Sequence, residues 1–255
     1  MKLRICLLLF CCFFNSRLFA QTAKEIEADF MKSFDKLNYL RADTSTTSID
    51  KLIYANSKIE EKLKYYTQKA PSAMAQAFVK CGGLVSDDGL MRILSWDTLT
   101  GGTEHSFENV IQYRSTPTAN FITISSENQS KYVYNYDKLY TLNVNGKNYY
   151  LVTYYGIFDL YIRGEGIRVF SIENGKLNAQ AKLIKTQKGL TNKLYYTYDQ
   201  QENNLDVMGD ATLTYNSKLK TITFPVVIDN GEEGKLTDNF ITYKFTGQYF
   251  EKVKP

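Results

Sequence analysis

Apolar residues recur every three or four positions between residues 21 and 83, which predicts a helical N-terminal segment. The first stretch, Ala23–Leu40, forms one apolar stripe at helical spacing, made of Ile26, Phe30, Phe34 and Leu37. A second stretch begins at Ser48, a candidate N-cap, and its positions predicted to face inward are Ile49, Leu52, Ile53, Ile59, Leu63 and Tyr66. Pro71 suits the first turn of a third, shorter helix.

From Leu84 onward the hydrophobic period changes to two, and pairs of turn-forming residues separate the strand-like runs. These pairs are Asp88-Gly89, Gly101-Gly102, Asn145-Gly146, Asn174-Gly175 and Asn230-Gly231. No stretch after residue 81 predicts a helix, so nucleotide-binding folds built from parallel β-α-β units are excluded. The sequence therefore predicts an α+β fold in which residues 84–255 form a large antiparallel β domain. That domain is expected to be a meander, sandwich or barrel-like sheet, with a small propeller as the alternative.

The first 20 residues have the pattern of a secretory signal peptide. Lys2 and Arg4 open the chain, an apolar run extends from Ile5 to Phe14, and Ala20 offers a small residue for cleavage. The run is shorter than the ~20 apolar residues that span a bilayer. We therefore expect a periplasmic or secreted protein that keeps no transmembrane anchor after the signal is cleaved.

Removing residues 1–20 changes both the charge and the cysteine content of the chain. The signal carries three basic residues, so the formal net charge falls from +4 to +1. A nearly neutral chain with scattered charges gives no basic face for nucleic acid. Cys81 is the single cysteine left, which excludes an intrachain disulfide and a cysteine-rich metal site. No cofactor is expected.

Twenty tyrosines are unusual for a chain of 255 residues and are typical of a strand-rich protein. In the segment YVYNY, Tyr132, Tyr134 and Tyr136 share one strand face. Together with Trp96 they are candidate ligand-binding residues, because an exposed aromatic platform suits a glycan or a peptide. The alternative interpretation is an ordinary half-buried sheet face.

The segment Ser95–Tyr113 holds the single tryptophan and the single histidine of the chain. Its hairpin tip brings together Asp97, Glu104 and His105, which could act as the acid and base of a small hydrolytic site. Alternatively, the tip is structural: Gly101 or Gly102 takes a positive φ, and the loop hydrogen-bonds to itself. One histidine cannot supply the usual zinc ligands, and no G-x-S-x-G motif supplies a nucleophilic serine. We expect Trp96 and Phe107 to lie in the core.

Three segments of the β half, ILSWDTLTGGT, NGKNYYLVTYYG and ITYKFTGQYFEKV, resemble segments of secreted bacterial proteins that have no assigned function. The resemblance implies secretion and carries over no catalytic residue. The function expected from the sequence is that of an exported, non-enzymatic binding or scaffold protein that contacts a glycan, a peptide or an envelope protein. The alternative is an envelope hydrolase with its site near Asp97, Glu104 and His105.

Overall fold

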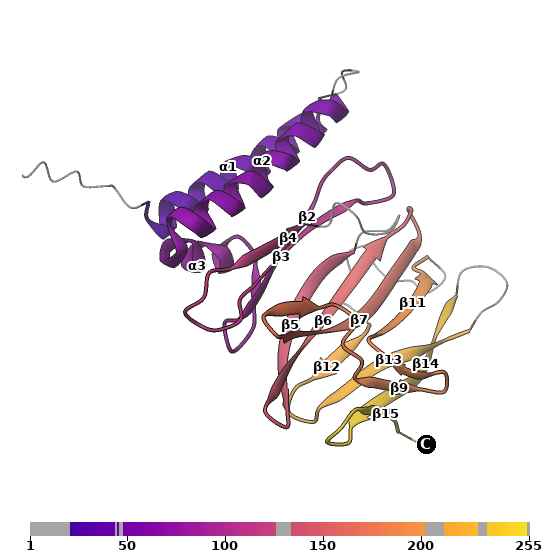
Figure 1. Ribbon diagram of the computed structural model, residues 1–255. Coiled ribbons are helices and arrows are strands. Elements are labelled where there is room, and N and C mark those ends of the chain that lie inside the picture. Colours follow the sequence, from indigo (N-terminus) through magenta and orange to yellow (C-terminus); the bar gives the residue numbers. More distant parts are fainter. Residues whose placement is uncertain are drawn as a thin grey trace, which may run out of the picture.

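The computed structural model describes residues 21–43, 45, 48–125, 134–201, 212–228 and 234–253, so the predicted signal segment lies outside the described residues. Figure 1 shows a layer of helices followed by stacked β-sheets. The predicted α+β fold is confirmed, because three helices precede a set of mainly antiparallel sheets. Within the described ranges every sheet stays open, so the β half is a stack of sheets and not a closed barrel.

The helical layer consists of α1 (Ala23–Arg41), α2 (Ser48–Lys69) and α3 (Pro71–Lys80). Thr22 and Glu25 form a capping box at the start of α1, and Pro71 occupies the first turn of α3, as predicted. Ile26, Phe30 and Leu37 are buried, which confirms the inward stripe of α1. None of the described helices combines the length and the apolar character that a membrane crossing requires.

The strands of the described ranges form three sheets. The first sheet has the order β1 (Leu84–Val85), β2 (Met91–Asp97), β3 (Phe107–Tyr113) and β4 (Ile122–Ser125). The central sheet has the order β11 (Lys193–Asp199), β7 (Ile162–Glu173), β6 (Lys147–Ile157) and β5 (Asn135–Val144), and β8 (Lys176–Asn178) pairs with β7. The third sheet has the order β10 (Gly189–Thr191), β9 (Ile184–Thr186), β15 (Phe250–Lys252), β14 (Lys235–Phe245), β13 (Thr221–Ile228) and β12 (Thr214–Asn216). Strands β9 and β15 run parallel, whereas the other strand pairs in the described ranges are antiparallel.

Three hydrophobic clusters join the four layers. The helices pack on one face of the first sheet, where Leu94, Trp96 and Val110 are buried among helical side chains. The opposite face of the first sheet contributes Met91 and Ile93 to a second cluster with the central sheet. A third cluster lies between the central and third sheets. The first and central sheets are therefore covered on both faces, and the period-two pattern of the sequence assigns alternate side chains to different layers.

Two residues of α2 contradict the predicted inward stripe. Ile49 and Ile53 are 44% and 57% exposed, although Leu52 between them is buried. Asn56 of the same helix bonds to the carbonyl of Thr98, which directly follows the end of β2. The start of α2 therefore projects beyond the end of β2, as Figure 1 shows, and Ile49 and Ile53 there find no strand to pack against in the described part of the chain.

Candidate functional site

The β2–β3 hairpin brings Asp97 and His105 into contact. Asp97 ends β2 and pairs in register with Phe107, two residues after His105. His105 Nδ1 lies 2.6 Å from Asp97 Oδ2, and the two side chains are 36% and 24% exposed. The other carboxylate oxygen of Asp97 accepts a hydrogen bond from the backbone N–H of Leu99 at 2.8 Å. The pair thus combines an oriented imidazole with a carboxylate that also closes the turn.

Hydrogen bonds within the hairpin tip, and one to β6, hold it in place. The backbone N–H and the hydroxyl of Thr98 both donate to the carbonyl of Ser106, each at 2.8 Å. The backbone N–H of His105 donates to the carbonyl of Ile157 at the end of β6. The rings of His105 and Phe107 stack at 6.1 Å. These contacts agree with the structural interpretation of the loop, in which its polar groups bond to one another.

Glu104 does not join the Asp97–His105 pair. Its side chain is exposed, and no hydrogen bond or ion pair of the described residues links its carboxylate to either partner. The structure therefore brings together two of the three residues proposed for a hydrolytic site. Within the described ranges, no group of three or more His, Cys, Asp or Glu side chains is placed to hold a metal ion.

The structure contradicts the prediction that Gly101 or Gly102 takes a positive φ. Neither glycine has a positive φ; Leu99 takes that conformation instead, with φ 57°. A Cβ at Gly101 would collide with the carbonyl oxygen of Glu104, whereas a Cβ at Gly102 would meet nothing within 4 Å.

Gly101→Ala should therefore lower the free energy of unfolding by about 1–3 kcal/mol, because the loop backbone must move. Gly102→Ala should change it by less than about 0.5 kcal/mol. Urea unfolding of both variants measures the difference, and equal losses would contradict this geometry.

Trp96 lies on the opposite face of β2 from Asp97 and is only 6% exposed. Its indole N–H donates to Asn56 Oδ1 at 2.7 Å, and the Asn56 amide donates to the carbonyls of Leu52 and Thr98, both at 2.9 Å. Trp96 and Phe107 are both buried, as expected from the sequence. Trp96 therefore fixes α2 to the first sheet and offers no open ring to a ligand.

The tyrosine platform is a packed aromatic cluster. Tyr132 lies outside the described residues, whereas Tyr134 and Tyr136 are half-buried against Tyr154, at 4.7 and 6.1 Å between ring centroids. The cluster also covers glycines of β6 and β7: a Cβ at Gly164 would lie 2.8 Å from the ring of Phe158 and from the Tyr195 hydroxyl. Aromatic rings placed over strand glycines fill the space that missing side chains leave.

Cys81 is a half-buried thiol at the end of α3, packed against the helical core. Burial raises the pKa of Cys81 to about 11, with a smaller contribution from the charge of Glu27. The thiol is therefore protonated at neutral pH, which disfavours a nucleophilic role.

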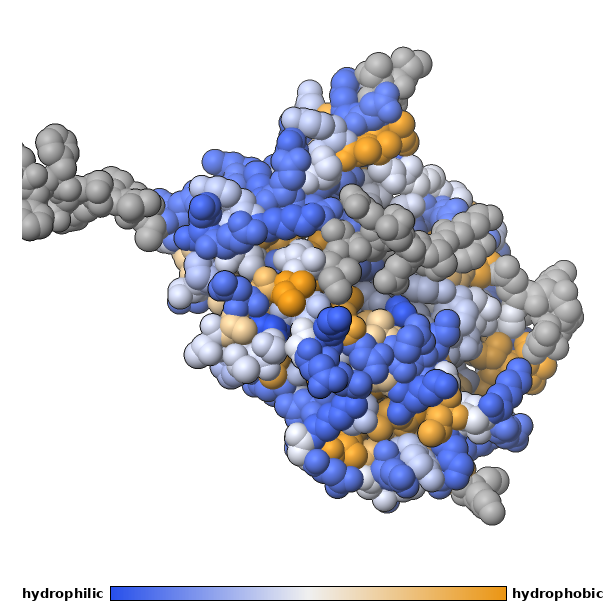
Figure 2. Space-filling model, in the orientation of Figure 1, coloured by the Kyte–Doolittle hydropathy of each residue, from blue (hydrophilic) through white to orange (hydrophobic). Residues whose placement is uncertain are grey.

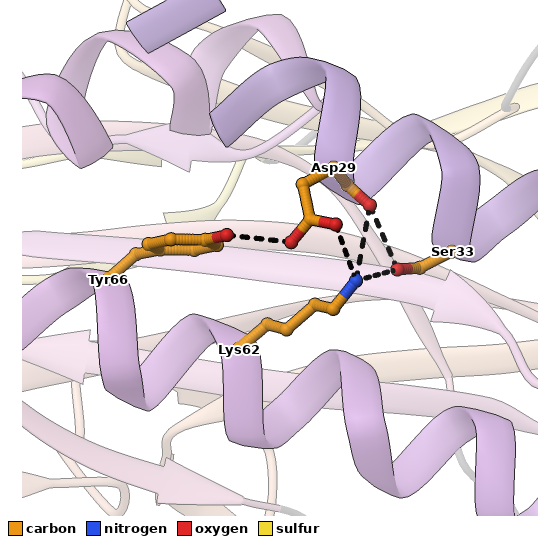
Figure 3. Close-up of polar contacts among 4 residues, drawn as sticks. All are labelled: Asp29, Ser33, Lys62 and Tyr66. Carbon is orange, nitrogen blue, oxygen red and sulfur yellow. Dashed lines mark hydrogen bonds and ion pairs between the residues drawn. The ribbon is translucent and has the colours of Figure 1, made fainter. Parts of the chain in front are cut away.

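A polar network that the sequence pattern did not reveal joins α1 to α2 (Figure 3). Lys62 Nζ lies 2.8 Å from both Asp29 Oδ1 and Ser33 Oγ, and the Tyr66 hydroxyl donates to Asp29 Oδ2 at 2.7 Å. Burial alone would raise the pKa of Asp29, but the bonds from Lys62 and Tyr66 outweigh it and lower that pKa. Burial and the Asp29 carboxylate raise the pKa of Tyr66 to about 12. The network fixes the two helices as one hairpin.

Large apolar side chains are exposed at the free end of this hairpin. We call Tyr39, Ile49, Ile53 and Tyr54 the apolar end; Tyr39 is 76% and Tyr54 60% exposed. Of these residues Tyr54 also lines a hollow of about 350 Å³, together with Lys36, Leu40, Asp50 and Lys51. Figure 2 shows apolar surface at this end of the molecule. Sequence reasoning assigned Ile49 and Ile53 to the core, so it recognised their apolar stripe but not its exposure.

Comparison with protein-family models, with curated proteins and with solved structures finds no match to this chain.

Proposed function

We propose that this protein is an exported, non-enzymatic binding protein, and that the apolar end of the α1–α2 hairpin contacts a protein partner in the envelope. The observation that carries this proposal is the exposure of Ile49 and Ile53 on an otherwise buried stripe of α2. Ile49 and Ile53 lie one helical turn apart, and neighbouring exposed apolar side chains are typical of interaction sites. A rigid hairpin also presents them with little loss of conformational entropy on binding.

The chemistry of the apolar end favours a protein partner over a glycan or a short polar peptide. Two isoleucines and two tyrosines form its apolar part, and Lys36, Asp50 and Lys51 line the hollow next to Tyr54. An apolar centre with a charged rim is the usual anatomy of a protein–protein interface. The Asp29–Lys62–Tyr66 network holds the two helices together, so the partner meets a preformed surface.

Export is the part of the proposal that the N-terminal sequence supports. The mature protein recovered from cells should begin at or near Gln21, because the charged start and apolar run of residues 1–20 are typical of a cleaved signal. N-terminal sequencing measures this directly. Recovery of an intact chain that begins with Met1 from the cytoplasm would contradict export.

A charge at the apolar end tests the binding function. Ile53→Glu should leave stability nearly unchanged, because the side chain is already 57% exposed. The tagged Ile53→Glu protein should capture about tenfold less of the envelope partner, or less still. The reason is that a desolvated charge in an apolar contact costs more than about 1.4 kcal/mol. Val79→Glu, on the exposed surface of α3, is the matched control and should retain capture. Equal capture by the wild type and both variants would contradict a contact at the apolar end.

The Asp97–His105 contact supports a second candidate function, an envelope hydrolase that uses His105 as a general base. This alternative predicts turnover of a glycoside, ester or peptide substrate by the wild type and its loss in His105→Ala. Our proposal predicts no turnover by either protein. It also predicts that His105→Ala changes the free energy of unfolding by about 0–1 kcal/mol, as expected for a partly exposed polar contact. Robust wild-type turnover that disappears in the variant would favour the hydrolase.

A further inference from the structure

Arg92 is a buried cation held between two aromatic rings. It lies on the helix-facing side of β2 and is 2% exposed. Its guanidinium carbon Cζ lies 4.8 Å from the centre of the Phe78 ring and 4.0 Å from that of Phe121. Arg92 Nε donates to Gln112 Oε1 at 2.6 Å, and Nη2 donates to Thr67 Oγ1 at 3.2 Å. Neutral acceptors and aromatic faces thus surround a full positive charge.

A second arginine approaches the same phenyl ring. Arg114 directly follows β3, and its Cζ lies 4.6 Å from the centre of the Phe121 ring. Its Nε donates to the carbonyl of Gly89 at 3.1 Å. Burial, together with the charge of Arg114, lowers the pKa of Arg92 to about 10. The two guanidinium groups therefore concentrate positive charge around Phe121.

No carboxylate of the described residues forms an ion pair with either arginine. A guanidinium has five N–H donors, and the bonds within the described part of the chain use two on Arg92 and one on Arg114. Burying a charge without a counter-charge is costly, and proteins usually pair such groups. The arrangement has surplus donors and surplus positive charge at one place.

We propose that Arg92 and Arg114 form a binding site for a small oxyanion, a carboxylate or phosphate group, beside Phe121. Guanidinium forks match the oxygen spacing of both groups and bind them with charge-assisted hydrogen bonds. Arg114 and Phe121 are half-buried, so the anion approaches from their side, while Arg92 lies deeper. The bound anion supplies the negative charge that Arg92 lacks among the described residues. This site is separate from the apolar end of the hairpin and does not depend on the proposed partner.

Thermal unfolding of the mature protein in different anions tests the site. At constant pH and ionic strength, replacing chloride by inorganic phosphate or by acetate should raise the midpoint in a saturating manner, by about 4 °C or more. Comparing the two anions distinguishes a phosphate from a carboxylate ligand. A wild-type midpoint that shows no saturating rise with either anion would overturn the proposal.

Substitutions test whether the anion raises the unfolding midpoint by binding at Arg92 and Arg114. Arg114→Gln should fold, because the side chain is half-buried, and it should abolish the rise caused by the anion. Arg41→Gln removes an exposed arginine at the end of α1 and should keep the full rise, which controls for general charge effects. Arg92→Met should also abolish the rise, and if it does not fold, Arg114→Gln alone decides. An undiminished rise in Arg114→Gln would contradict the site.

Discussion

Replacing Glu165 by alanine should lower the free energy of unfolding by about 3–5 kcal/mol, because a buried charged acceptor with several partners is lost. Glu165 lies on β7 and is 1% exposed. Its carboxylate accepts hydrogen bonds from the Tyr198 hydroxyl at 2.6 Å and from the backbone N–H groups of Thr212 and Leu213, both at 2.8 Å. Without it, these buried donors lose their acceptor. Urea unfolding followed by circular dichroism measures the loss.

Two variants control this experiment. Glu165→Gln keeps one acceptor oxygen and should cost less than the alanine substitution. Glu251→Gln removes one partner of the exposed ion pair with Lys185 and should leave stability nearly unchanged. Burial, followed by the charge of Glu165, raises the pKa of Tyr198, so this hydroxyl stays protonated as a donor over the whole physiological range. A loss below about 1 kcal/mol for Glu165→Ala would contradict the assigned role.

Trp96→Ala should destabilise the protein by about 3–5 kcal/mol, through the cavity that it leaves between α2 and the first sheet. It also removes the indole N–H that donates to Asn56. Trp96→Phe should cost less, since an aromatic ring remains, but it leaves Asn56 Oδ1 without that donor. Unfolding in urea compares the two variants. A small effect of Trp96→Ala, similar to that of an exposed residue, would indicate that the ring does not lie in the core.

Local features of the fold follow from the sequence. Asn145 and Gly146 take φ values of 51° and 81° at the β5–β6 turn, as the Asn-Gly pair predicts. Asn174 and Gly175 do the same between β7 and β8. The period of two predicted from Leu84 onward is also confirmed in β2, where Leu94 and Trp96 face the helices while Met91 and Ile93 face the central sheet. Periodicity and turn chemistry act over a few residues, so one sequence is enough to predict them.

The stacking of layers depends on contacts between distant segments, and the sequence pattern did not predict it. Ile49 and Ile53 have the spacing of core residues, but their exposure depends on where β2 ends relative to α2. Gly101 avoids a clash with the carbonyl of Glu104 and does not take a positive φ, because Leu99 takes the left-handed conformation in this loop.

The candidate site was predicted only in part. The hairpin register brings Asp97 to His105, but the direction of the Glu104 side chain depends on the loop backbone. The anion site had one visible signal, because Arg92 shares a strand face with Leu94 and Trp96, where a charged residue is unexpected. Its partners Phe78 and Phe121 come from α3 and from the position directly before β4, and no local pattern connects them.

A photo-crosslinking amino acid at position 53 of the exported protein tests the central claim most directly, because it reports a contact at the apolar end in intact cells. The account predicts one discrete adduct with a partner at position 53, its loss when Ile49→Glu is added, and no such adduct from position 79 on α3, where Val79 is equally exposed. No adduct at position 53, or the same adduct from both positions, would contradict the proposal that the α1–α2 hairpin binds a protein partner.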